Sequence, residues 1–174
     1  MIRVPPSVLF AALALGLAAC AGNNGAPVEQ PTFYRSLASP LAELDADAAA
    51  SMISGYRQNN GLGAVTLDPN LMRLAQEQAR TMAARDKLDR DTKGEFAKRM
   101  AASGFDSKVS VENISAGYHT LAEAFSGWRD SPPHRANMLK SGVTRMGIAA
   151  VYTPASKYKV YWALILAAPE PGKG

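Results

Sequence analysis

The amino-acid sequence predicts an α/β fold, a three-layer α/β/α sandwich with a largely antiparallel central sheet. Patterns typical of helices come first along the chain, and two adjacent strand patterns come last. In the last strand Val160, Trp162 and Leu164 share one face, while Ala163 and Ile165 make the other face apolar as well. A strand that is apolar on both faces lies inside a sheet covered on both sides, so we expect a helical layer on each side of this sheet.

The first two helices are predicted from apolar residues that recur at helical spacing. Residues 41–58 carry such a pattern, which ends at the sequence NNGLG. The second helix has the clearest boundaries, with Asp68 as its N-cap and Pro69 as its first helical residue. Its buried stripe is expected to contain Leu71, Leu74, Ala75, Met82 and Ala83, with Gln78 or Ala79 between them.

Shorter helices and three strands complete the predicted domain. A third helix fits residues 95–103 and closes at Gly104, and a fourth begins at Thr120, where the sequence TLAE has the pattern of a capping box. Strands are predicted over residues 108–115, 145–153 and 157–169, the last two as an antiparallel hairpin around the turn sequence PAS.

The N-terminal part of the chain carries the pattern of an exported, lipid-anchored protein. Residues 1–19 are predicted to be a signal peptide, because Arg3 precedes an apolar stretch that is too short to span a bilayer. The small residues that follow stop at Cys20, the only cysteine, as in bacterial lipoproteins. Acyl chains on Cys20 would anchor the protein to a membrane. An ordinary signal peptide with a chance cysteine is the alternative.

The predicted organisation is therefore a lipidated cysteine and flexible tether over residues 20–40, one folded domain over 41–170 and a tail over 171–174. Ala21, rather than an aspartate, follows Cys20. The expected location is the cell envelope, at the periplasmic face of the outer membrane if the organism is Gram-negative.

Charge and cysteine content exclude two classes of function. The formal net charge is +4, but the lysines and arginines are scattered, without the aromatic-interleaved basic stripe of a nucleic-acid-binding protein. No nucleic-acid partner is expected. With Cys20 acylated, the domain keeps no thiol, so it has no disulfide, no cysteine nucleophile and no cysteine metal ligand.

Four segments in order resemble the CAP superfamily, also called SCP-like proteins, which includes cysteine-rich secretory proteins, antigen 5 and pathogenesis-related proteins. The first, YRQNNGLGAVTLDPNLMRLAQEQARTMA, is similar to the opening helices of the family. VENISAGY is similar to the Gly-Glu-Asn motif of the family, with Val111 in the glycine place. AFSGWRDSPPHRANML is similar to the bacterial signature W..SPGHR.N.L, and TRMGIAAVY with YKVYWALILA is similar to the closing hairpin. The resemblance implies the same α/β/α sandwich.

The resemblance also implies a cleft with two histidines and two acidic residues, which holds a divalent metal in some members. Only part of that set is present. Glu112 matches the acid of the Gly-Glu-Asn motif and His134 matches the second histidine, whereas Ser131 stands at the second acid. Arg90, or Asp89 or Asp91 with a small shift, stands where the family has its first histidine. Zinc needs three or four protein ligands, so no metal site and no cofactor are expected, with weak divalent-cation binding through the two aspartates left open.

The sequence therefore favours a non-catalytic binding module for a lipid, a cell-wall-associated ligand or a protein of the envelope. Ser131 is expected to cap a short helix that carries HRANML, and His134 to hydrogen-bond Glu112, which would raise the pKa of the imidazole. The alternative is a peptidase or esterase with Glu112 and His134 as catalytic candidates. The expected cleft residues are Arg90, Glu112, Asn113, Ser131, His134 and Arg135.

Overall fold

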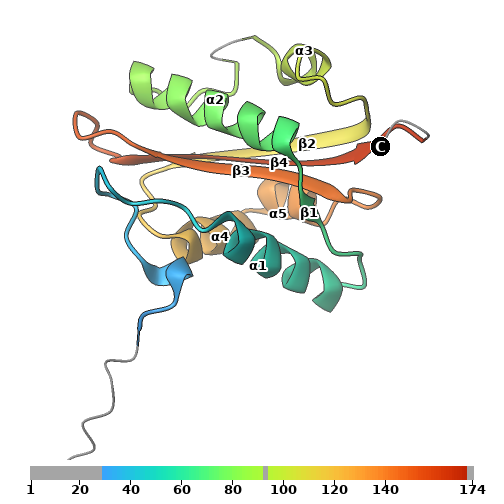
Figure 1. Cartoon of the computed structure of the whole chain (residues 1–174), viewed down its shortest axis with the longest axis horizontal. Helices are drawn as coiled ribbons and strands as arrows, with labels where there is room; N and C mark the ends of the chain where they lie inside the picture. Colours follow the sequence, from blue (N-terminus) through green and yellow to red (C-terminus); the bar gives the residue numbers. More distant parts are fainter. Residues whose placement is uncertain (1–28, 92–93, 172–174) are drawn as a thin grey trace, which may run out of the picture.

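The computed structural model describes residues 29–91 and 94–171, and it has the predicted three layers (Figure 1). Helices α2 and α3 cover one face of the sheet, and α1, α4 and α5 cover the other. In chain order the elements are η1 (Thr32–Tyr34), α1 (Ala46–Asn59), β1 (Thr66–Leu67), α2 (Pro69–Arg85), α3 (Phe96–Ala101), β2 (Ser107–Ala116), α4 (Leu121–Asp130), α5 (Pro132–Met138), β3 (Arg145–Tyr152) and β4 (Val160–Pro169).

The sheet has the strand order β1-β3-β4-β2, so β4 is an inner strand and β2 lies at an edge. β4 pairs antiparallel with both β2 and β3. The two-residue strand β1, which the sequence pattern did not predict, pairs parallel with β3. The sheet is therefore mixed, with antiparallel pairing between its three long strands. Residues 160–168 of β4 are all buried, which confirms that this strand is covered on both faces.

Helix ends follow the capping residues in the sequence. Asp68 accepts hydrogen bonds from the backbone N–H groups of Asn70 and Leu71, and Pro69 is the first residue of α2, as predicted. Thr120 and Glu123 form the predicted capping box at the start of α4. The first helix begins at Ala46 instead of residue 41, because Asp45 takes the N-cap position.

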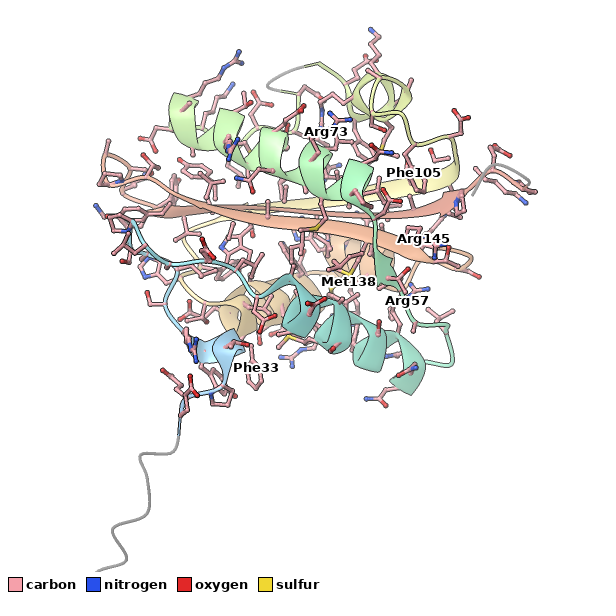
Figure 2. All side chains as sticks on the ribbon, in the orientation of Figure 1. Phe33, Arg57, Arg73, Phe105, Met138 and Arg145 are labelled. Carbon is pink, nitrogen blue, oxygen red and sulfur yellow. The ribbon has the colours of Figure 1, made fainter. Side chains whose placement is uncertain are left out.

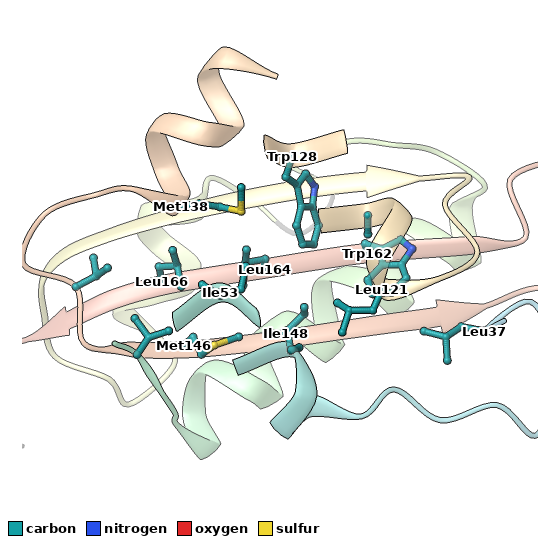
Figure 3. Close-up of a cluster of buried hydrophobic side chains, with 14 of the residues drawn as sticks. Leu37, Ile53, Leu121, Trp128, Met138, Met146, Ile148, Trp162, Leu164 and Leu166 are labelled. Atoms are coloured by element: carbon teal, nitrogen blue, oxygen red, sulfur yellow. The ribbon is translucent and has the colours of Figure 1, made fainter. Parts of the chain in front are cut away.

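Two apolar clusters, one on each face of the sheet, form the core. The cluster beneath α1, α4 and α5 is built from large side chains, among them Trp128, Trp162, Leu164 and Met138 (Figure 3). The cluster beneath α2 and α3 contains smaller side chains from β4, including Ala163 and Ala167. All the residues predicted for the buried stripe of α2 are buried.

The packed part of the chain begins before the predicted boundary at residue 41. Leu37 is buried, and its backbone N–H donates to the carbonyl of His119 at 2.6 Å. The hydroxyl of Thr32 donates to the carboxylate of Asp45 at 2.7 Å. The prediction of a flexible tether through residue 40 is corrected here, because an apolar side chain and these two hydrogen bonds hold residues 32–37 against the domain.

The predicted signal peptide, Cys20 and residues 172–174 of the predicted tail lie outside the described residues. In the described part of the chain, no helix combines the length and the apolar character that crossing a membrane requires.

Candidate functional site

Glu112 lies in the middle of the edge strand β2, and its side chain is buried with 1% of its surface exposed. Its partner is Arg99 of α3, whose side chain is also buried, with 7% exposed. The Nη2 atom of Arg99 donates to both carboxylate oxygens, at 3.0 Å to Oε1 and 2.9 Å to Oε2. The centre of the site is therefore a buried, charge-assisted ion pair.

Burial raises the pKa of the Glu112 carboxyl, and the nearby guanidinium groups of Arg99 and Arg90 oppose that shift. Removing a carboxylate from water costs free energy that an ion pair offsets only with good geometry. Both carboxylate oxygens of Glu112 already accept hydrogen bonds from Arg99. The positive guanidinium stabilises the ionised carboxylate and so makes it a weaker general base.

Arg90, in the loop after α2, lies at the same edge strand. Its Nη2 atom donates to the backbone carbonyl of Glu112 at 3.3 Å, while its Nε atom is 3.8 Å from Oε2 of the carboxylate. The side chain of Arg90 is half-exposed. Where the resemblance implied a histidine, the structure thus places an arginine beside the expected glutamate. The closer ion-pair partner of the glutamate, however, is Arg99.

Asparagine side chains tie α5 to the edge of β2. Asn113 is buried, and its Nδ2 atom donates to the backbone carbonyl of His134 at 3.0 Å. The Nδ2 atom of Asn137 donates to the carbonyl of Glu112 at 3.1 Å and to Oδ1 of Asn113 at 2.9 Å. These bonds fix the backbone of α5 against the strand that carries the buried glutamate.

The predicted hydrogen bond between His134 and Glu112 is wrong. Within the described residues, the His134 imidazole makes no hydrogen bond, and only its backbone carbonyl is bonded. Partial burial lowers the pKa of His134, and the positive charge of Arg90 lowers it further. The expected rise in the pKa of His134 is therefore also wrong, because burial and then the positive charge of Arg90 both disfavour the protonated imidazole.

Ser131 takes the N-cap position of α5 and Pro132 follows as its first residue, but the serine side chain makes no capping hydrogen bond. The predicted side-chain cap is thus corrected, and only the backbone carbonyl of Ser131 accepts, from the N–H of Arg135 at 2.8 Å. The Arg135 side chain donates to the backbone carbonyls of Arg129 and Asp130 at the end of α4. The structure therefore brings Arg90, Glu112, Asn113 and the backbone of His134 together, whereas Arg135 binds elsewhere.

Arg99 is the residue at this site that the sequence analysis missed. Phe96, Arg99 and Met100 are spaced so that they share one helix face. Arg99 and Met100 are buried on that face, and Phe96 packs at its edge. An arginine within the apolar stripe of a short helix indicates a buried ion pair. The sequence of residues 96–100 contains this pattern and could have identified Arg99.

No group of three or more His, Cys, Asp or Glu side chains that could hold a metal ion occurs in residues 29–91 and 94–171. Asp89, one of the aspartates left open for a cation, is paired with Lys87 at 2.9 Å. The chemistry that this arrangement supports directly is hydrogen bonding and charge pairing.

Comparison with known proteins gives one family and one fold. The CAP family model, described as the cysteine-rich secretory protein family, matches residues 50–166. The uncharacterised protein YkwD of Bacillus subtilis is 27% identical over 139 residues, which make up 72% of this chain and 54% of that protein. The chain thus spans about half the length of this relative.

Two solved structures show the same fold at low sequence identity. An outer surface protein from Borrelia burgdorferi superposes with a TM-score of 0.66 and 16% identity, over 72% of this chain and 93% of that one. An extracellular protein containing an SCP domain from Bacillus anthracis superposes with a TM-score of 0.61 and 18% identity, over 70% of this chain and 39% of that one.

Proposed function

The chain belongs to the CAP, or cysteine-rich secretory protein, family, and from that premise we propose that it is a non-catalytic binding module of the cell envelope. Its ligand is a lipid, a cell-wall-associated molecule or an envelope protein. The family has one fold and several attributed roles, so the role must be argued from the site and not from the fold.

The observation that carries this proposal is the ion pair between Arg99 and Glu112. A general base must be free to accept a proton from a substrate or a water molecule. Here the buried carboxylate accepts from a guanidinium at both oxygens, and the imidazole of His134 is not bonded to it. Among the described residues, no hydrogen bond joins the side chains of Ser131, His134 and Glu112, which a Ser-His-Glu hydrolase would use.

The cell-envelope location is supported by the N-terminal sequence and by the relatives. Cys20 follows an apolar stretch and small residues in the lipoprotein pattern. The solved structures with the same fold include an extracellular protein and an outer surface protein. Lipidated Cys20 would hold the domain at the membrane, with the residues before Pro31 as the connecting segment.

The binding role is tested by native mass spectrometry of the full chain, expressed with its N-terminal segment and extracted from membranes in mild detergent. The proposal predicts an added mass on the folded domain that disappears on denaturation, beyond the mass of the acyl groups on Cys20. A domain that carries no non-covalent ligand and captures none from an envelope extract would contradict a binding role.

The hydrolase alternative is tested with the same preparation. Peptidase and esterase activity are measured for the wild type and for His134→Ala, together with the melting temperature of both. The proposal predicts no activity above background in either protein. Activity that is present in the wild type and lost in a His134→Ala protein of unchanged melting temperature would favour the enzyme.

The anchor is tested by Cys20→Ser. The variant is expected to lose the acyl mass and to leave the membrane fraction, while its melting temperature stays unchanged. A variant that remains in the membrane fraction would contradict anchoring through this residue.

A further inference from the structure

The outer edge of β3 is only partly covered by a neighbouring strand. β1 pairs with β3 at Arg145 and Met146 alone, at the beginning of the strand, where Arg145 is labelled in Figure 2. Among the described residues, the last backbone bond on this side runs from the N–H of Asp68 to the carbonyl of Met146, at 2.9 Å. Beyond it, no described strand pairs with this edge over residues 148–152.

Part of the backbone along this edge has no partner within the described chain. Backbone groups of successive strand residues point to alternate sides of the strand. The N–H of Thr153 donates to the carbonyl of Lys159 on the β4 side, and the carbonyl of Met146 accepts on the β1 side. The N–H and C=O groups of Ala150 and Tyr152, at even positions like Met146, therefore point outward. No described residue forms a hydrogen bond with them, so they are available to a partner.

The opposite edge of the sheet is protected, which makes the edge of β3 the exception. At β2 the pairing with β4 is irregular near its first residues, and Arg90 and Asn137 donate side-chain hydrogen bonds to the carbonyl of Glu112. Bulges, charged residues and prolines are the usual protection of an edge strand. Residues 147–153, with the sequence GIAAVYT, contain no charged residue and no proline. An unprotected edge of this kind is a template for an added strand.

A groove with a volume of about 380 Å³ lies at this edge. Its lining includes β3 residues 148–150, Arg80 of α2 and Glu43 of the segment before α1. α2 lies on one side of the sheet and that segment on the other (Figure 1). The N–H of Ile148 meets only the thioether of Met72, a weak acceptor, at 3.3 Å. The groove therefore opens on the backbone edge and has a wall on each side.

The charges on the two walls indicate which side chains a partner strand would carry. Arg80 and Glu43 are exposed, and neither side chain forms an ion pair or a hydrogen bond with a described residue. Side chains of a strand alternate between its two faces, so a strand in the groove presents one set to each wall. An acidic side chain in one set would meet Arg80, and a basic one in the other would meet Glu43. An acyl chain would leave the polar backbone edge unpaired, so the groove fits a peptide better than a lipid.

We propose that the open edge of β3 binds an extended segment of a partner protein, which joins the four-stranded sheet as an additional strand. The backbone of the segment bonds to the outward N–H and C=O groups of Ala150 and Tyr152. An acidic side chain of the segment pairs with Arg80, and a basic side chain on its opposite face pairs with Glu43. This inference rests on the proposed binding role, and it names a protein as the partner, at a surface separate from the ion pair of Glu112.

The test is amide hydrogen exchange of the full chain in mild detergent, followed residue by residue in ¹H–¹⁵N NMR spectra. The probe is the heptapeptide VEVTKTV with both ends capped, whose glutamate and lysine lie on opposite faces of a strand. Without peptide, the amides of Ala150 and Tyr152 should exchange fast, whereas those of Ala149 and Val151, which point toward β4, exchange slowly. Saturating peptide should slow the exchange of Ala150 and Tyr152 at least tenfold, because their N–H groups become bonded.

Two kinds of control peptide separate backbone pairing from other contacts. VEVKTTV has the same composition, but its glutamate and lysine share a face, so it should bind about two- to fivefold more weakly because only one charge pair can form. N-methylation of VEVTKTV at alternate residues removes the N–H groups on one side of the strand. Methylation on one side should abolish binding, and methylation on the other side should leave it unchanged.

Protein variants place the binding at this groove. Arg80→Glu reverses the charge on the α2 wall and should weaken the binding of VEVTKTV by about fivefold or more. Lys140→Glu makes the same change in charge at an exposed residue that does not line the groove, and it should leave binding unchanged. Ala150→Pro removes an outward N–H, a change that edge strands tolerate, and it should abolish binding. Arg80→Glu, at an exposed position, keeps the test decisive if the proline unfolds the domain.

The inference fails if Ala150 and Tyr152 already exchange slowly in dilute protein, since the chain itself would then cover the edge. Protection that appears with rising protein concentration instead of with peptide would assign the edge to a second copy of the chain and would also overturn it. So would the absence of protection at millimolar VEVTKTV, or equal binding of both N-methylated peptides. A ligand found by native mass spectrometry that leaves the exchange of Ala150 and Tyr152 unchanged would support the binding role and contradict this inference.

Discussion

The two faces of the sheet are held to their helices in different ways. The face toward α1, α4 and α5 is packed with large apolar side chains, and Trp128 and Trp162 meet edge to face there with ring centroids 6.2 Å apart. The face toward α2 mixes small residues such as Gly147 and Ala163 with the larger Tyr161 and Ile165, and the backbone of α2 approaches Gly147 closely. Polar pairs add to this packing beyond the end of α2, where Arg99 and Glu112 form a buried ion pair and the buried Tyr161 donates its hydroxyl to the exposed Asp86.

This difference shows why the candidate site lies where it does. The face toward α1, α4 and α5 is closely packed with large side chains, although the buried Nε1 atom of Trp128 has no hydrogen-bond partner among the described residues. The α2 face combines close backbone contact at Gly147 with the buried ion pair of Arg99 and Glu112 beside α3. Packing on both faces therefore contributes to stability, while the buried ion pair of the candidate site lies on the side of α3.

The largest effect is expected at Gly147, where α2 meets β3. A Cβ atom at this position would lie 2.1 Å from the backbone carbonyl carbon of Leu71, which cannot move without shifting the helix. Gly147→Ala should therefore destabilise the domain by on the order of 4 kcal/mol or more, measured by urea unfolding. The control is Gly55→Ala in α1, where open space surrounds the position and alanine should stabilise by about 0.5–1 kcal/mol. Equal stability of the two variants would show that α2 does not lie this close to the sheet.

A somewhat smaller effect is expected on the apolar face. Leu164→Ala removes a side chain that is 1% exposed in the large-residue cluster, and the resulting cavity should cost about 2–5 kcal/mol. Leu41→Ala makes the same change at a residue that is 93% exposed, and it should alter the free energy of unfolding by less than about 0.5 kcal/mol. A loss below 1 kcal/mol for Leu164→Ala would mean that this face is loosely packed.

The helix caps give a pair of still smaller effects. Thr120→Ala removes a side-chain bond to the start of α4 and should cost about 1 kcal/mol in thermal or urea unfolding. Ser131→Ala stands at the N-cap of α5, where the side chain makes no capping bond, and should cost less than about 0.5 kcal/mol. Comparable losses in both variants would restore the capping role that the sequence predicted for Ser131.

The smallest effect is a pH dependence from His134. Burial and Arg90 lower the pKa of His134 in the folded state below its ordinary value of 6.5, so the unfolded chain takes up the proton at higher pH. The contribution of neutral His134 to the free energy of unfolding is therefore fully present above about pH 6.5, and it is lost as the pH falls through the folded-state pKa. Unfolding at pH 7.5 and pH 5 should show a smaller loss of stability for His134→Gln than for the wild type. A larger loss in the variant would mean that His134 is paired with an acid after all.

The fold could be predicted from the sequence because its signals are local. Asp68 with Pro69 and the TLAE capping box each determine a helix start through bonds within four residues. The apolar character of both faces of β4 predicts its central place. The two-residue strand β1 is too short to carry a periodic pattern, and its pairing with β3 depends on residues far away in the sequence.

The site could be predicted only in part because its contacts are long-range. The motifs predicted a common cleft for Glu112, Asn113 and His134, and in the structure Asn113 donates to the backbone carbonyl of His134. They could not show that burial and the charge of Arg90 lower the pKa of His134, which is the reverse of the predicted shift. Arg99 matches none of the segments on which the resemblance rests, and its role depends on how the short helix α3 sits against β2.

The central claim is that Glu112 is a structural, arginine-paired carboxylate, and a double-mutant cycle tests it most directly. The free energy of unfolding is measured for the wild type, Arg99→Met, Glu112→Gln and the double variant. Each single change leaves a buried group without its partner and should cost about 3–5 kcal/mol. The double variant should cost less than the two single losses together, with a coupling of about 1.5 kcal/mol or more. Single losses that add to within about 0.5 kcal/mol would show that the two side chains act independently, and the account would fail.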